Sequence, residues 1–138
     1  IESAGFSFEV ELPEELPPLL ADREAFTQVV ANLLDNAAKY GRGDELVVRL
    51  EARLAEGALL IKVSDRGPGV PSDERERIFQ RFFRSPQVPR EVGGAGLGLA
   101  IARLQARAQG GELWVEEGAD GAGACFVFRL PLAGDVEA

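Results

Sequence analysis

The sequence predicts an α+β protein, a two-layer sandwich in which a mixed sheet of about five strands packs under about three helices. Some short segments alternate apolar and polar residues with the period of two that is typical of strands. Longer segments repeat apolar residues every three or four positions, as amphipathic helices do. Because the two kinds mix without strict alternation, a two-layer sandwich is favoured over a doubly wound parallel sheet.

Five segments are predicted to be strands. They cover residues 6–12, 48–54, 59–63, 112–116 and 124–131. The first three show the alternation most clearly, and a Glu56-Gly57 turn joins the second and third into a β-hairpin. Prolines at positions 13, 17 and 18 end the first strand, because proline lacks the N–H that a sheet requires.

Three segments are predicted to be helices. In the first, Asp22 is a suitable N-cap, apolar residues follow at helical spacing as far as Ala37, and the end lies near position 40. The second runs from Ser72 to Phe83, with Ser72 as its cap and acidic residues in its first turn. The third begins in the last residues of a GGAGLGL run and continues to Gln109.

Length and composition are those of one soluble domain covering residues 1–138, with 46% apolar and 28% charged residues. The formal net charge is −8 and lysines and arginines form no cluster, which excludes a nucleic-acid surface and direct contact with an anionic membrane. No stretch approaches the roughly 20 apolar residues that span a bilayer. Without histidine, the single Cys125 cannot contribute to a zinc site, and we expect it to act as a small apolar residue.

One face of the first predicted helix combines neutral polar groups with a cation. Asn32, Asn36 and Lys39 fall within about 60° of one another on a helix and lie off its apolar stripe. Asn is a poor helix former, so a merely solvated face would be better served by Glu or Lys. The face therefore indicates a polar ligand site, although surface residues beside a core stripe give the same pattern.

Asp65 follows Ile61 and Val63 in phase, so the alternation predicts that its carboxylate points to the core side of the sheet. A buried carboxylate needs a partner. The exocyclic amine of adenine is a suitable donor, and Gly67 and Gly69 would let the backbone approach a flat ring. A turn-capping Asp before glycine is the alternative.

Glycines at positions 93, 94, 96 and 98 lead into the third predicted helix. Their free N–H groups and missing side chains suit the close approach of phosphate, and the helix dipole adds attraction. The run lacks the Lys-Ser or Lys-Thr of a Walker loop, and no strand directly precedes it as in a dinucleotide fingerprint.

Four motifs together carry a resemblance that none carries alone. NLLDNAAKYG, DRGPGVP, ERIFQRFFR and GGAGLGLAIA resemble the N box, first glycine box, F box and second glycine box of bacterial sensor histidine kinases, in the same order and spacing. The match covers residues 6–130 and is similar to the catalytic ATP-binding domain of these kinases, within the wider group of gyrase-like, Hsp90-like and MutL-like ATPases. It implies the Bergerat fold, with ATP and Mg²⁺ as ligands.

The resemblance also implies roles for residues of the N box and first glycine box. Asn36 resembles the residue that holds magnesium and bridges it to the phosphates, and Asn32 is an accessory polar contact. Lys39 resembles the phosphate-contacting lysine and Tyr40 the aromatic residue beside the nucleotide. Asp65 resembles the residue that reads adenine, in a pocket shaped by the glycines at positions 67 and 69.

Residues 85–92 resemble the ATP lid, a loop that orders over bound nucleotide. The phosphate side of the pocket and the hinge of the lid would comprise Gly94, Gly96, Leu97 and Gly98. Arg84 and Arg90 would reach the γ-phosphate, although arginines on a mobile loop are often only solvated. Phe79, Phe82 and Phe83 would anchor the base of the lid in the core, and Trp114 would be a core or interface residue. Ala95 stands where many relatives carry Ser or Thr.

Asn32 favours a kinase over a hydrolase. Relatives that hydrolyse ATP carry a Glu four residues before the magnesium-binding Asn, as the general base for water. A carboxamide cannot accept that proton, so catalysis would rest on positioning and charge stabilisation by Asn36, Lys39 and Arg84. The acceptor would be a histidine. Because this chain contains no histidine or methionine, we expect it to be a piece of a longer protein with a phosphoacceptor dimerisation domain before residue 1.

For the full protein, the resemblance implies contact with its own phosphoacceptor domain, a homodimer, and a cognate response regulator. It also implies that this is the cytoplasmic domain of a bacterial inner-membrane sensor. Two alternatives stay open: a serine protein kinase of the anti-sigma-factor type, and a non-catalytic module that senses nucleotide.

Overall fold

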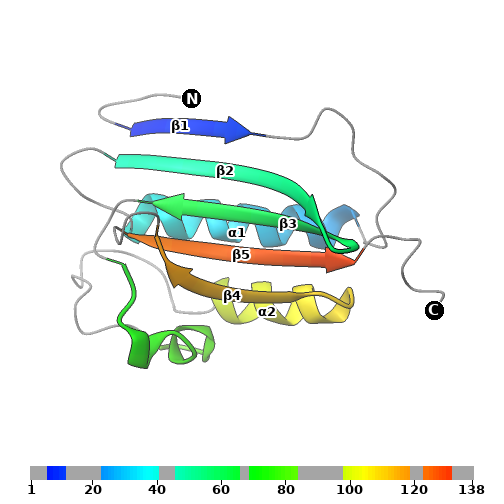
Figure 1. Cartoon of the computed structure of the whole chain (residues 1–138). Helices are drawn as coiled ribbons and strands as arrows, with labels where there is room; N and C mark the ends of the chain where they lie inside the picture. Colours follow the sequence, from blue (N-terminus) through cyan, green and yellow to red (C-terminus); the bar gives the residue numbers. More distant parts are fainter. Residues whose placement is uncertain are drawn as a thin grey trace.

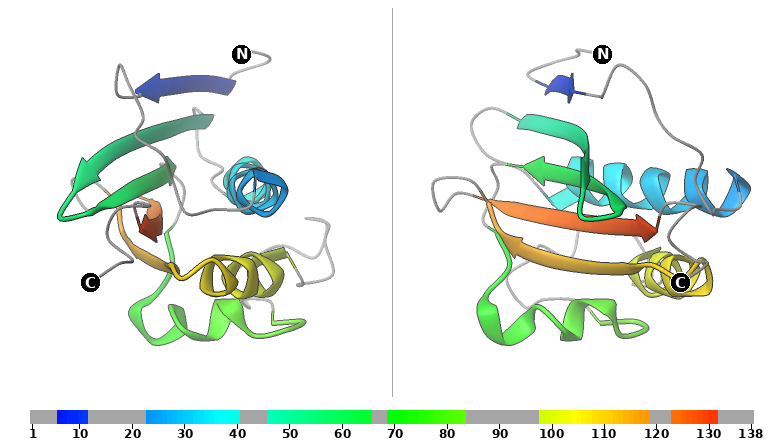
Figure 2. Two further views of the ribbon diagram at one scale, coloured as in Figure 1. Left: turned by 90° about the vertical axis from the view of Figure 1, so that its right-hand side faces the viewer. Right: turned by 45° about the vertical axis from the view of Figure 1, so that its right-hand side comes forward.

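The structure, a computed structural model, describes residues 6–11, 23–40, 46–65, 69–83, 98–118 and 123–131. Within these residues, two α-helices cover one face of a five-stranded sheet (Figure 1). The strands are β1 (Phe6–Glu11), β2 (Leu46–Ala55), β3 (Ala58–Asp65), β4 (Glu112–Glu117) and β5 (Ala124–Pro131), and the helices are α1 (Arg23–Tyr40) and α2 (Gly98–Ala108). Figure 2 shows both helices on the same side of the sheet. The predicted two-layer α+β sandwich is confirmed.

The sheet is mixed, with strand order β1-β2-β3-β5-β4. β1 runs parallel to β2, and the other neighbours are antiparallel. The predicted hairpin is present: Glu56 and Gly57 both adopt positive φ, 47° and 77°, in the two-residue turn between β2 and β3. Its register pairs Val48 with Asp65, which places Asp65 at the end of a central strand.

The core lies between the sheet and the helices. α1 buries Val29, Leu33 and Ala37, each at most 1% exposed, as its apolar stripe predicts. Alternate residues of β2, β3, β4 and β5 complete this core, and these are Val48, Ala52, Leu59, Ile61, Val63, Leu113, Val115, Ala124, Phe126, Phe128 and Leu130. α2 turns small buried residues inward, Ala102 and Ala106, so it lies close to α1 and the sheet. Gln105 on α2 also donates a side-chain hydrogen bond to Gln28 on α1.

The predicted helix from Ser72 to Phe83 is wrong. The segment instead forms two single 3₁₀ turns, η1 (Ser72–Glu74) and η2 (Arg77–Phe79), and the chain is extended at Gln80. Ser72 makes no cap, because the residue before η1 is Pro71 and no side-chain cap bond is present. The physical reason is tertiary: the ring of Phe79 packs edge-on against Phe126 in the core, with centroids 6.3 Å apart, and the chain then turns away.

The same break separates the three aromatic residues of this segment. Phe79 is 7% exposed, whereas Phe82 has a φ of 64° and is 67% exposed. Phe83 is half-buried, with the guanidinium of Arg77 5.0 Å from its ring centroid. The expectation that all three anchor in the core is therefore wrong for Phe82, because a continuous helix would be needed to bring them to one face.

The face of the sheet away from the helices is more polar. Cys125 lies there and is buried, and burial raises the pKa of its thiol, so it is the small apolar residue that the sequence predicts. Trp114 is half-buried and its indole N–H donates to Glu116 at 3.0 Å. None of the helices in the described part of the chain combines the length and apolar character needed to cross a membrane.

Candidate active site

Several elements that carry predicted site residues meet at one end of the sandwich. The C-terminal half of α1, the end of β3, the start of β5 and the start of α2 all lie there (Figures 1 and 2). Seven of the predicted residues belong to the described part of the chain, and they are Asn32, Asn36, Lys39, Tyr40, Asp65, Gly69 and Gly98. The fold therefore brings to one end of the molecule the elements that carry these residues, which are up to 66 positions apart in the sequence (from 32 to 98).

Asp65 is buried, as the alternation predicts, with 7% of its surface exposed. Its Oδ1 accepts a hydrogen bond from the Ala124 N–H at 3.2 Å, which fixes the carboxylate at the start of β5. Ala124 is 59 residues away, so this bond is not explained by a local turn cap. A carboxylate held in this way keeps a defined orientation at the end of the sandwich.

The structure shows why position 69 requires glycine, which the sequence did not predict. Its φ is +79°, and a Cβ added there would lie 2.9 Å from the Gly123 carbonyl oxygen. That oxygen already accepts the Gly118 N–H at 3.1 Å at the base of the β4–β5 loop. Only glycine lets the backbone after β3 pass this close, so the residue fixes the loop next to Asp65 and Ala124. Approach of Gly69 to an adenine ring stays a prediction.

Asn32 and Asn36 lie one turn apart on α1, and both are half-buried. A Cβ on Gly98 would meet the Asn32 Oδ1 at 3.6 Å, so this carboxamide oxygen faces the first residue of α2. The carboxamide oxygen of Asn36 fits Mg²⁺, a hard cation that prefers oxygen ligands and retains water and phosphate oxygens as its others.

For the other predicted residues the structure describes either the backbone alone or nothing. Lys39 and Tyr40 are in the last turn of α1, but only their backbone is described. Outside the described residues altogether are Gly67, Arg84, Arg90, Gly94, Gly96 and Leu97, together with Asp22, Ala95 and the lid stretch 85–92. Their roles stay predictions.

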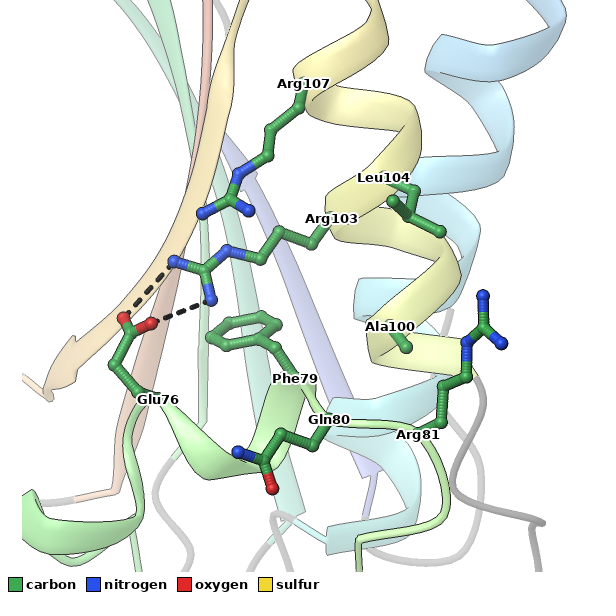
Figure 3. A pocket seen from close by; sticks show the side chains of 8 residues that line it. All are labelled: Glu76, Phe79, Gln80, Arg81, Ala100, Arg103, Leu104 and Arg107. Carbon is green, nitrogen blue, oxygen red and sulfur yellow. Dashed lines mark hydrogen bonds and ion pairs between the residues drawn. The ribbon is translucent and has the colours of Figure 1, made fainter.

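A second feature near this end was not predicted. A cavity of about 330 Å³ lies between the turns at residues 76–81 and α2 (Figure 3). It is lined by Glu76, Phe79, Gln80, Arg81, Ala100, Arg103, Leu104 and Arg107. Its charged residues are separated by up to 31 positions (from 76 to 107), and no local pattern in the sequence links them.

Residues 21–134 match the family model for histidine kinase-, DNA gyrase B-, and HSP90-like ATPases. The chain belongs to this ATPase family. The adaptive-response sensory kinase SasA of Prochlorococcus marinus is 37% identical over 131 residues, which are 94% of this chain and 34% of that protein. The chain thus spans about a third of the length of the curated relatives it matches.

Solved structures of histidine kinases share the fold of this ATPase domain. Full-length ShkA in complex with AMPPNP is 35% identical, with a TM-score of 0.77 over 94% of this chain and 26% of that one. Histidine kinase ThkA in complex with the response regulator TrrA is 27% identical, with a TM-score of 0.74 over 94% of this chain and 35% of that one. The resemblance to the ATP-binding domain of sensor histidine kinases is confirmed.

Proposed function

We propose that this domain binds ATP with Mg²⁺ and donates the γ-phosphoryl group to a histidine on a separate phosphoacceptor domain. The observation that carries the proposal is the buried carboxylate of Asp65, which Ala124 holds in place at the end of the sandwich. A carboxylate in this position can accept the exocyclic amine of adenine and distinguish it from a carbonyl. The nucleotide analogue bound to the similar ShkA supports this ligand class.

Within the proposed site, each polar residue has a separate task. Asp65 reads the base, and the carboxamide of Asn36 holds Mg²⁺, with Asn32 as an accessory contact. When bound, Mg²⁺ neutralises charge that develops on the phosphates. Lys39, Arg84 and Arg90 contact the phosphates, and the glycines at positions 67, 94, 96 and 98 with Leu97 line the pocket beside Tyr40.

The same residues favour transfer to an imidazole over transfer to water. Asn32 stands where a hydrolase needs a general base, and a carboxamide cannot accept a proton from water at neutral pH. In the proposed step, the bond from the γ-phosphorus to the β,γ-bridging oxygen breaks. A bond from phosphorus to an imidazole nitrogen forms, and ADP leaves.

The full protein would supply what this chain lacks. The chain contains no histidine, so the acceptor belongs to another segment, which we place in a helical dimerisation domain of a homodimer. The ThkA–TrrA complex supports a response regulator as the next partner. An anchor in the bacterial inner membrane is part of the same proposal.

The isolated chain is expected to bind nucleotide but to incorporate no label from γ-labelled ATP. Adding a histidine-bearing phosphoacceptor domain from the full protein should produce a labelled band on that added domain. The label should be lost in acid, because phosphohistidine is acid-labile and phosphoserine is not. Label on the isolated chain, or acid-stable label on the partner, would contradict the histidine-kinase proposal, and the second result would favour the serine-kinase alternative.

An exposed apolar surface offers a contact for the phosphoacceptor domain. Ile101 and Leu104 lie three residues apart on one face of α2 and are 43% and 57% exposed. Leu104 and Arg81 line the same cavity, and the exposed Phe82 follows Arg81. In the described residues, Leu54 is the one other large apolar side chain with comparable exposure, at 44%. We assign the surface made by Phe82, Ile101 and Leu104 to docking of the acceptor helices.

Leu104→Asp is expected to slow phosphoryl transfer to the added phosphoacceptor domain by about tenfold, because it places a charge in the apolar contact. Transfer should be measured at a subsaturating acceptor concentration, and nucleotide affinity should stay within about twofold of the original. Leu54→Asp is the matched control, since Leu54 is similarly exposed at the far end of β2. Equal effects of the two substitutions would contradict this docking surface.

A further inference from the structure

Arg103 makes close contact with the turn that precedes the predicted lid. Its guanidinium lies over the ring of Phe79, 4.5 Å from the centroid, and its two terminal nitrogens donate to the two carboxylate oxygens of Glu76 at 3.0 and 3.2 Å (Figure 3). The Arg103 side chain is 14% exposed. Since Phe79 also packs against Phe126, its ring lies between the core and a partly desolvated cation.

The other side of Arg103 is tied to the sheet. Its Nε donates to Glu112 at 3.4 Å. Glu112 in turn accepts hydrogen bonds from Arg107 at 3.1 and 3.2 Å and from the Leu113 N–H at 2.8 Å. The bidentate geometry and the shared carboxylate form a network, which holds a defined geometry better than one exposed ion pair does.

Charge effects on the two acids agree with these contacts. The hydrogen bond from Arg103 holds the pKa of Glu76 below its usual value. Burial raises the pKa of Glu112, but the bonds from Leu113 and Arg107 outweigh it, so its net pKa is also lowered. Both carboxylates therefore stay ionised at neutral pH, and the network is intact there.

The network joins the turn at residues 76–79 to α2. Arg103 lies five residues after Gly98, where α2 begins. The start of α2 is also beside Asn32. Loss of the contacts that Arg103 makes would therefore free the start of α2 to move relative to Asn32 in the proposed nucleotide site.

We propose that Arg103 is a positioning residue for nucleotide binding, which holds α2 in place through Glu76, Phe79 and Glu112 so that Gly98, the first residue of α2, stays beside Asn32. This inference rests on the proposed function, because it requires that the domain binds ATP. A residue that only stabilises the fold would lower the melting temperature without changing the affinity of the folded protein.

Three variants separate these roles by calorimetric titration with AMP-PNP and Mg²⁺, at a temperature where circular dichroism shows each variant to be folded. Arg103→Met keeps much of the apolar length of the side chain but removes the ion pair. If about a tenth of the molecules then keep α2 in the binding-competent position, the apparent Kd rises about tenfold. Arg103→Lys keeps the charge without the planar fork, so the Kd should rise by an intermediate factor, about threefold. Arg53→Met removes the same charge at an exposed position on β2, outside the network, and should change the Kd by less than about twofold.

Hydrogen exchange without nucleotide provides a second readout. Arg103→Met should speed exchange of the amides in residues 76–83, and Arg53→Met should leave them near the original rate. Faster exchange with an unchanged Kd in Arg103→Met would overturn the inference and leave Arg103 as a structural contact only. If Arg103→Met does not fold, Arg103→Lys decides by the same criteria. Absence of binding in the unsubstituted chain would instead overturn the proposed function itself, and this inference with it.

Discussion

Asp65→Asn and Asn36→Ala are each expected to raise the Kd for AMP-PNP with Mg²⁺ at least tenfold, a loss of about 1.4 kcal/mol or more. At position 65, the carboxamide can still accept the Ala124 N–H, but it presents an NH₂ group where the adenine amine needs an acceptor. At position 36, alanine removes the oxygen proposed to hold Mg²⁺. Titration calorimetry measures both, and the Asn36→Ala loss should shrink when Mg²⁺ is withheld.

Matched substitutions control for indirect effects on the fold and on charge. Glu51→Gln makes the same chemical change as Asp65→Asn, on β2, where Glu51 pairs with Lys62 away from the helix face. Asp35→Ala truncates the exposed residue next to Asn36. Both controls should bind nucleotide within about twofold of the original chain. If both site variants bind as tightly as these controls, the site assignment is wrong.

The strands and two α-helices were predictable because their signals are local. The alternation of β3 continues to Asp65 and so predicts its burial, and the stripe that includes Val29 and Leu33 predicts the buried face of α1. The break after Phe79 was not predictable in this way. Local preferences favour a helix there, whereas packing of Phe79 against Phe126 from β5 decides the outcome.

The candidate site likewise contains residues that a local pattern predicts and contacts that only the tertiary structure shows. Asp65 could be found from its position on a strand, but its partner Ala124 comes from another strand 59 residues away. Arg103 and Glu76, which form a hydrogen-bonded ion pair, are 27 residues apart in the sequence. In the sequence, each of them looks like an ordinary charged surface residue. Contacts of this kind depend on the order of strands and on the placement of α2, which periodicity does not determine.

Gly111→Ala is expected to have the largest effect on stability, a loss of about 3 kcal/mol or more in the free energy of unfolding. A Cβ there would lie 2.0 Å from the Arg129 carbonyl oxygen, which is backbone of β5 and cannot rotate away. Gly111 also closes α2, since its N–H donates to Ala106 while the Gly110 N–H donates to Arg107, the two bonds of a Schellman motif. Relief of the clash must therefore separate β4 from β5 or α2 from β4.

Gly110→Ala is the control for backbone strain without a clash. Gly110 has a φ of +82°, but its added Cβ would meet only a side-chain carbon of Pro131, at 3.7 Å. Alanine in that conformation costs about 1–2 kcal/mol. Urea denaturation followed by circular dichroism should therefore rank Gly111→Ala well below Gly110→Ala. Equal stability of the two variants would mean that the end of α2 can shift relative to β5. Glu112, which anchors the Arg103 network, would then not be held in a fixed position.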